Sequence, residues 1–147
     1  MKKTYAPLLV LSLGGLVTAC TMMDESKEEM MEEGKAAMAD VTPSLSLADQ
    51  PRSDGVVMID ALTLDKPGYV VIHKDADGKP GPVIGQSAVI DAGKHENYRV
   101  EFDASEAGAA VFPMLHYDNG DGVYEFPGPD GPVVVGGNVL VGKVTWQ

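Results

Sequence analysis

The sequence predicts an all-β domain over residues 43–147, with the architecture of an immunoglobulin-like two-sheet β-sandwich of about seven to nine strands. Short runs rich in Val, Ile, Thr and aromatic residues alternate there with clusters of Gly, Pro, Asn and Asp, and no stretch has the period of an amphipathic helix. About 105 residues suffice to bury the inner faces of two sheets. The Cys, Trp, Cys pattern of true immunoglobulin domains is absent, so the comparison concerns architecture alone.

Nine runs of β-forming residues are the predicted strands: residues 44–49, 55–64, 68–73, 82–90, 95–103, 109–118, 122–126, 131–135 and 138–146. Two connections between them carry strong turn signals. Asp77-Gly78 predicts a two-residue hairpin, and Gly136-Gly137 joins the runs "VVV" and "VLV".

The last run, residues 138–146, has one side suited to the core. Leu140, Val144 and Trp146 alternate with more polar positions, and Gly142 lies between them. Because successive side chains of a strand point to opposite faces, we expect these three residues to face inward.

Residues 1–19 form a predicted signal peptide. Lys2 and Lys3 precede an apolar run of about a dozen residues, which ends in the small-residue stretch "VTAC". The run is shorter than the roughly 20 residues needed to span a bilayer as a helix.

Val17-Thr18-Ala19-Cys20 resembles the lipobox of bacterial lipoproteins. That resemblance implies cleavage before Cys20, acylation of its sulfur and new N-terminus, and a lasting membrane anchor outside the cytoplasm. Asp after the lipidated cysteine commonly signals inner-membrane retention; Thr21 stands here, so the outer membrane is expected in a two-membrane bacterium. The alternative is an ordinary secretory signal with an incidental cysteine.

Composition excludes several function classes. Cys20 is the single cysteine, so no disulfide forms within the chain, and lipidation would leave no thiol for catalysis. Removal of residues 1–19 takes away two lysines and leaves a net charge of −13. Nucleic acid and anionic lipid would be repelled, so we expect no nucleic-acid partner.

Residues 20–42 form a predicted acidic tether, disordered or weakly helical. Like-charged i,i+4 pairs such as Glu28 and Glu32 oppose a stable helix. The segment is rich in methionine, whose thioether sulfur can bind Cu(I). The alternative is that the segment is only a solvated spacer. Five of the chain's eight methionines lie here: Met22, Met23, Met30, Met31 and Met38.

From about Ser44 to Trp146 the chain resembles an uncharacterised β-sandwich domain of secreted and surface proteins, common in haloarchaea and also found in bacteria. The stretches that carry the resemblance are "PGYVVIHKDADGKPGPVIGQS", "DAGKHENYRVEF", "MLHYDNGDGVYEF" and "DGPVVVGG". It implies a surface module, and no established activity comes with it.

Two acidic loops are a candidate calcium site. Each partly matches a calcium loop, but the closing glutamate is missing, so a site requires oxygen ligands from both loops. If the strands before them run in the same direction, the loops emerge at one end of the sandwich. The alternative is that Asp and Asn serve the turns themselves. The candidate ligands are Asp75, Asp77, Asp118, Asn119, Asp121 and Asp130.

His73 and His116 are candidate ligands of a transition metal. Each precedes an acidic loop, and neighbouring strands would bring the two imidazoles together. Met114 shares a strand face with His116, although no cysteine is available for a blue-copper centre. The alternative is that both are half-buried strand-end histidines.

We predict a non-enzymatic module of the cell envelope that binds a protein or polymer partner, with Ca²⁺ binding as the alternative and a small enzyme as a third hypothesis. No nucleophile elbow, zinc-protease motif or phosphate-binding glycine loop is present, and no cofactor other than Ca²⁺ is expected. An exposed aromatic patch is predicted around Tyr117, Tyr124 and Phe126.

Overall fold

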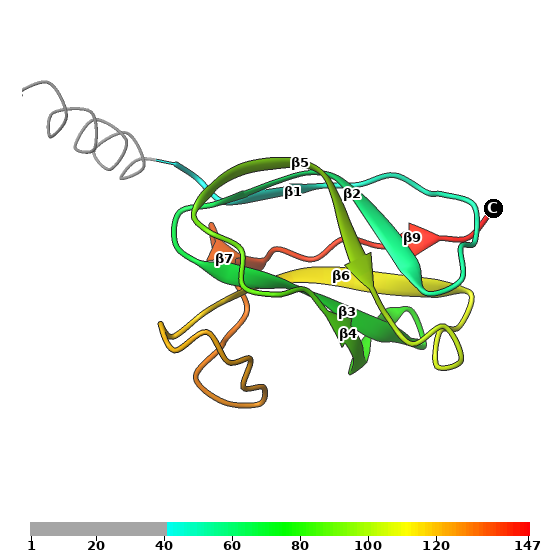
Figure 1. The fold of residues 1–147 in the computed structure, drawn as a ribbon. Helices are drawn as coiled ribbons and strands as arrows, with labels where there is room; N and C mark the ends of the chain where they lie inside the picture. The colour runs from blue at the N-terminus through cyan, green and yellow to red at the C-terminus, as the bar shows by residue number, and fades with distance from the viewer. Residues whose placement is uncertain (1–40) are drawn as a thin grey trace, which may run out of the picture.

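The chain folds into an all-β sandwich of two antiparallel sheets, described over residues 41–147 by a computed structural model (Figure 1). The predicted signal peptide, Cys20 and the tether up to residue 40 lie outside the described residues. Within residues 41–147, no helix is long and apolar enough to cross a membrane. The strands are β1 (Ser44–Ser46), β2 (Val56–Leu64), β3 (Gly68–Ala76), β4 (Lys79–Gln86), β5 (Gly93–Glu101), β6 (Ala110–Tyr117), β7 (Val134–Val135), β8 (Asn138–Val139) and β9 (Val144–Thr145).

The strand order confirms the predicted architecture. A three-stranded sheet, β1-β2-β5, faces a four-stranded sheet, β4-β3-β6-β9, and β7 pairs with β8 as a separate hairpin. This arrangement corresponds to immunoglobulin-like strands A-B-E facing C′-C-F-G. Consecutive strands β2 and β3 therefore belong to different sheets, whereas β3 and β6 are antiparallel neighbours.

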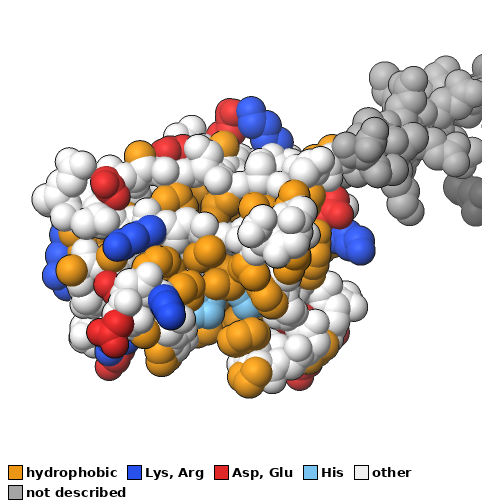
Figure 2. Space-filling model, turned by 180° about the vertical axis from the view of Figure 1, so that it is seen from behind, with side chains coloured by type: hydrophobic (Ala, Val, Ile, Leu, Met, Phe, Trp, Pro, Cys, Tyr) orange, Lys and Arg blue, Asp and Glu red, His pale blue; other side chains and the backbone are white. Residues whose placement is uncertain are grey.

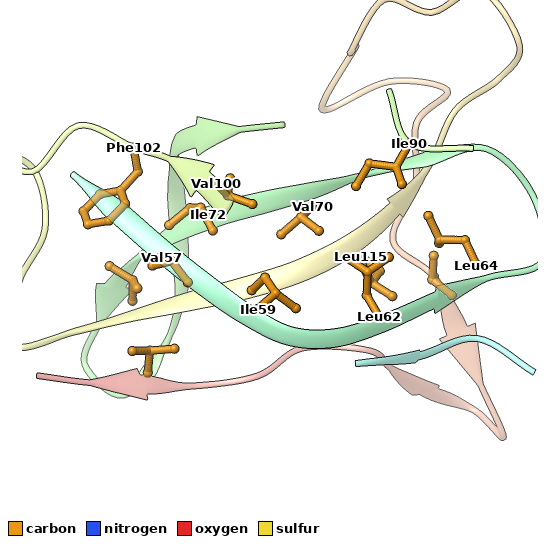
Figure 3. Packing of buried hydrophobic residues seen from close by; sticks show 13 residues of the cluster. Val57, Ile59, Leu62, Leu64, Val70, Ile72, Ile90, Val100, Phe102 and Leu115 are labelled. Carbon is orange, nitrogen blue, oxygen red and sulfur yellow. The ribbon is translucent and has the colours of Figure 1, made fainter. Parts of the chain in front are cut away.

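The core between the sheets is aliphatic except for the ring of Phe102 (Figure 3). In β2 the buried positions change phase at Asp60, from Val57 and Ile59 to Leu62 and Leu64. The partner strand β5 changes phase at the same level, where Asn97 has a φ of +52°. Figure 3 shows β2 curving around the core at this point, so that these four buried side chains all face the opposite sheet.

Both predicted turns are confirmed. Asp77 and Gly78 have φ values of +54° and +82° and connect β3 to β4. Gly136 and Gly137 have φ values of +58° and +84° and connect β7 to β8. Positive φ at both central residues is the geometry of a type I′ hairpin turn, which explains why aspartate and glycine stand at these positions.

The core-facing side of the last predicted strand is confirmed as well. Val144 is fully buried, and Leu140 and Trp146 pack against the core. A Cβ on Gly142 would lie 2.5 Å from Leu47 Cδ2, so a side chain at this position would require Leu47 to move. The run is not one continuous strand, because the chain leaves the sheet edge as the β7–β8 hairpin and returns only near Leu140.

The predicted strand over residues 122–126 is wrong, because this run lies in the irregular loop 118–131. The N–H of Glu125 donates to the buried carboxylate of Asp130 and not to a neighbouring strand. Gly122 and Pro127 flank the run, and the Phe126-Pro127 peptide bond is cis. The loop projects from one end of the sandwich (Figure 1).

Candidate functional site

The most unusual feature of the described residues is that both faces of the central strands β3 and β6 are buried. The inner face of β3 and β6 is aliphatic, whereas the outer face carries aromatic rings, two imidazoles and a thioether. None of these outer side chains is more than 8% exposed. We call them the outer-face cluster: Tyr69, Val71, His73, Phe112, Met114 and His116.

Loop 118–131 covers this cluster with two aromatic rings. The ring of Tyr124 lies edge-on to Tyr69, with centroids 5.3 Å apart, and Phe126 stacks beside Tyr124. Phe126 also stands perpendicular to both imidazoles, with its centroid 5.0 Å from that of His116 and 6.1 Å from that of His73. Figure 2 shows histidine atoms on this side of the molecule among apolar side chains.

The structure brings the two predicted histidines together. Because β3 and β6 pair with Tyr69 opposite His116 and His73 opposite Phe112, both histidines project from the same outer face. Their ring centroids are 5.7 Å apart and their planes are inclined by 26°. The expectation that they lie on neighbouring strands is confirmed, although the strands are antiparallel.

Each imidazole is oriented by one backbone carbonyl. His73 Nδ1 lies 2.7 Å from the carbonyl oxygen of Gly81, and His116 Nδ1 lies 2.9 Å from that of Asp130. A carbonyl oxygen only accepts hydrogen bonds, so each Nδ1 carries the hydrogen and donates it. In the neutral ring, Nε2 is then an acceptor with a free lone pair.

Neither of these acceptors has a partner. His73 Nε2 and His116 Nε2 are buried and make no hydrogen bond within residues 41–147. Burial lowers the pKa of His116 below its usual value of 6.5, and the nearby His73 acts in the same direction, against the hydrogen bond to the Asp130 carbonyl and the Asp130 charge. His116 is therefore held neutral at pH 7.

Tyr124 adds a third buried polar atom without a partner to the same place. Its hydroxyl makes no hydrogen bond in the described part of the chain, and its ring centroid lies 5.7 Å from that of His116. Burial, and secondarily the charge of Asp130, raise the pKa of Tyr124 to about 12. The hydroxyl thus stays protonated at pH 7. Three of the four unpartnered buried side-chain atoms in residues 41–147 belong to this one region.

The two acidic loops do not converge, so this part of the calcium hypothesis is wrong. Since β3 and β6 are antiparallel, the turn with Asp75 and Asp77 lies at one end of the sheet and loop 118–131 at the other (Figure 1). The expectation of a shared direction failed because the strand of residues 68–73 pairs directly with the strand of residues 109–118. Asp75 and His73 also lie inside β3 itself, which extends to Ala76.

The oxygen atoms of these residues mostly accept hydrogen bonds within their own turns. Asp75 Oδ1 accepts the N–H of Gly78 at 2.7 Å. In the other loop, Asp118 Oδ1 accepts the N–H of Gly122, and Asn119 and Asp121 bond each other's side chains and backbone. These contacts are the turn-forming role of Asp and Asn.

Asp130 differs from the other acidic residues because it is fully buried. Its Oδ1 accepts the N–H of Asn119 at 3.0 Å and its Oδ2 accepts that of Glu125 at 2.6 Å, while its carbonyl accepts from His116. One residue thus ties the loop together and orients the imidazole.

No group of three or more His, Cys, Asp or Glu side chains is positioned to hold a metal ion within residues 41–147. Ca²⁺ binding by the domain is otherwise untested and stays a prediction. Thermal melting with excess Ca²⁺ and with chelator tests it, since a ligand at 100 times its Kd adds about 2.7 kcal/mol of stability.

The predicted aromatic patch is split between the two faces of the sheet. Tyr117 packs against the core, and its hydroxyl donates to Asp65 at 2.7 Å. Tyr124 and Phe126 lie over the outer face instead. The alternation of side chains along the strand indicates the inward direction of Tyr117, because Tyr117 is in phase with the buried Val111 and Leu115.

A second concave surface lies on the three-stranded sheet, as an open groove of about 520 Å³ lined by residues that include Gln50, Met58 and Arg99. The side-chain amide of Gln50 bonds both the N–H and the carbonyl of Met58, which satisfies the edge of β2 there. The unpartnered buried atoms do not line this groove.

Comparisons with known proteins identify the family. Residues 43–147 match the family described as "Domain of unknown function (DUF7282)". The chain belongs to this family. It is also 32% identical over 111 residues to Cell surface glycoprotein 1 and to Cell surface glycoprotein 2 of Haloarcula hispanica. These alignments cover 74% of the chain and only 12% of each glycoprotein. No solved structure matches the chain.

Proposed function

We propose that this chain is a lipid-anchored module of the cell envelope, which presents its β-sandwich outside the cytoplasm to bind a protein or polymer partner and has no catalytic role. The observation that carries this proposal is the similarity to two proteins named cell surface glycoproteins. The predicted lipidation at Cys20 and the acidic segment that follows would supply the anchor and the tether.

An exposed apolar surface supports the binding role. Of the seven large apolar side chains exposed in residues 41–147, five lie between positions 123 and 141. Val134 and Val139 are paired across the β7–β8 hairpin and are 53% and 40% exposed. Such groups commonly mark interaction sites. We call the five side chains the hairpin patch: Val123, Phe126, Val134, Val139 and Val141.

Cross-linking in cells tests the binding role. Val134→Ser combined with Val139→Ser should abolish a cross-link between the full chain and an envelope component, because these two exposed side chains are paired across the hairpin and belong to the patch. Val89→Ser is the matched control, since Val89 is 43% exposed and lies outside the patch. Equal cross-linking in all variants would contradict a role for the patch.

The anchor is tested separately by metabolic labelling with an alkyne fatty acid. We expect the wild-type chain to be labelled and to remain with the membrane fraction, whereas Cys20→Ala should be unlabelled and released. A wild-type chain that carries a free thiol at Cys20 would overturn the lipid anchor and leave the sandwich as a secreted module.

A further inference from the structure

We propose that His73, His116 and Met114 hold one Cu(I) ion at the outer face of the four-stranded sheet. The observation behind this inference is the pair of buried imidazoles whose Nε2 atoms have no partner within residues 41–147. His73 is 4% exposed and His116 is fully buried, so neither Nε2 is satisfied by bulk water.

Both imidazoles already have the outer arrangement of metal-binding histidines. In metal sites, the second ring nitrogen almost always donates its hydrogen to a carboxylate, a backbone carbonyl or water, which fixes the tautomer and leaves the other nitrogen free to coordinate. The carbonyls of Gly81 and Asp130 take this role for His73 and His116. One such histidine is ordinary, whereas two on one surface with both free nitrogens buried indicate a shared ligand.

The separation of the rings fits one ion between them. An ion about 2.0 Å from each Nε2 lies about 3 Å from each ring centre, so two imidazoles that share it have centres about 5 to 6 Å apart. The observed centroid separation is 5.7 Å.

Met114 is the third ligand that the strand register places beside both histidines. It precedes His116 by two residues on β6, on the same face, and it lies opposite Val71, diagonally across from His73. Diagonal neighbours in an antiparallel pair are within reach of long side chains. Met114 is only 8% exposed, so its thioether belongs to the buried cluster.

The ligand set selects a soft, monovalent ion. Thioether sulfur prefers Cu(I), and imidazole accepts copper as well as zinc. All three ligands are neutral, and both carboxylate oxygens of the nearest acidic residue, Asp130, already accept backbone N–H groups. A divalent ion in this apolar surrounding would be desolvated without a counter-charge, at a cost that grows with its charge. A single positive charge is easier to hold here.

The cover of the site is aromatic. Phe126 stands perpendicular to both imidazoles, and Tyr124 lies against His116. The Tyr124 hydroxyl is able to donate a hydrogen bond to a further small ligand of the ion, such as a water molecule. Phe126 is 45% exposed, which makes it the part of the cover that an entering ion displaces.

The test is competition for Cu(I) between the full chain, solubilised in detergent under anaerobic reducing conditions, and a chromogenic Cu(I) chelator of known affinity. His73→Gln, His116→Gln and Met114→Leu should each weaken the domain site by at least about 100-fold, because loss of an outer-shell partner alone costs about 10- to 100-fold. The methionines of residues 21–40 are present in every variant and cancel in the comparison.

Two control variants match these substitutions. His95→Gln changes the third histidine, which lies on the other sheet with its Nε2 on the Asp91 carbonyl, and Met58→Leu changes an exposed methionine. Both should bind Cu(I) like the wild type. Equal binding by all five variants would overturn the site and leave an ordered water molecule between the imidazoles as the explanation. Zn²⁺ binding that the histidine substitutions abolish and Met114→Leu leaves unchanged would overturn the assignment to copper.

A measurement on the wild-type chain keeps the proposal testable if His116→Gln fails to fold. The X-ray absorption spectrum of the chain loaded with one equivalent of Cu(I) should show two nitrogen ligands and one sulfur ligand. A shell of sulfur alone would place the ion on the methionines of the N-terminal segment and contradict the proposal.

Discussion

The two faces of strands β3 and β6 are both buried but chemically different. The inner face presents Val70, Ile72, Val111 and Leu115, which are fully buried and purely aliphatic. The outer face presents two imidazoles, a thioether and aromatic rings. Loop 118–131 covers them, and the buried carboxylate of Asp130 accepts a hydrogen bond from the backbone of this loop. Aliphatic packing is what a sandwich core requires, whereas unpartnered nitrogen atoms in an apolar setting reduce stability. The inner face therefore stabilises the fold, whereas the outer face contains buried polar groups that do not stabilise it.

The largest expected effect on stability comes from the inner face. Leu115→Ala should lower the free energy of unfolding by about 3 to 4 kcal/mol, because it removes a fully buried side chain and leaves a cavity. Denaturant unfolding measures it. The same variant should leave both histidine tautomers unchanged, since Leu115 points away from them. An altered tautomer would show that the two faces are not independent.

Asp130 provides the next largest effect. Asp130→Ala removes the buried carboxylate that accepts hydrogen bonds from two backbone N–H groups, so we expect a loss of about 3 kcal/mol in unfolding free energy. Asp75→Ala is the matched control, because it removes one exposed hydrogen bond to Gly78 and should cost about 1 kcal/mol or less. Equal losses would contradict the structural role of Asp130.

The lowered pKa of His116 predicts that the free energy of unfolding decreases in acid. The pKa of His116 is lowered in the folded chain by burial and by the nearby His73, so the unfolded chain binds its proton first. His116 stabilises the fold fully above its ordinary pKa of 6.5, and this contribution is lost as the pH falls from 6.5 through the lowered folded-state value. The groups that face it are His73, Tyr124 and Asp130.

Unfolding measured from pH 8 to pH 5 checks this expectation. His116→Gln should flatten the curve below pH 6.5, whereas His95→Gln should not, because His95 lies on the other sheet. A wild-type curve that stays level down to pH 5 would contradict the neutral, buried state of His116.

Met114 should give the smallest effect on stability. Met114→Leu conserves volume in the outer-face cluster, so the free energy of unfolding should change by less than about 1.5 kcal/mol. A small change for Met114→Leu beside a large one for Leu115→Ala would show that the packing of Leu115, but not that of Met114, determines the free energy of unfolding. A loss as large as that of Leu115→Ala would assign Met114 to the core.

The sequence predicted the fold where the determining signals are local. Alternating apolar positions predicted most of the strands. The dipeptides Asp77-Gly78 and Gly136-Gly137 predicted two hairpins, because these residue types adopt the positive φ that tight turns require. The predicted strand at residues 122–126 failed because the decisive contact comes from Asp130, whose burial no local pattern indicates. The convergence of the acidic loops failed because strand direction depends on the sheet that each strand joins.

The site was predictable only in part. His73 and His116 were identified as candidates from their strand positions, and the register brings them and Met114 to one face. The carbonyls of Gly81 and Asp130 that set both tautomers come from a bulged strand pair and from an irregular loop. Such contacts exist only after the chain has folded, so residue types and spacing do not reveal them.

Nitrogen-15 NMR of the three histidine side chains in the wild-type chain tests the central claim most directly. We predict that the hydrogen lies on Nδ1 in His73 and His116 and on Nε2 in His95, whose Nε2 lies 2.9 Å from the Asp91 carbonyl oxygen. Hydrogen on Nε2 of either His73 or His116 would contradict the account, because the imidazole pair would then no longer offer two free nitrogen atoms to a common ligand.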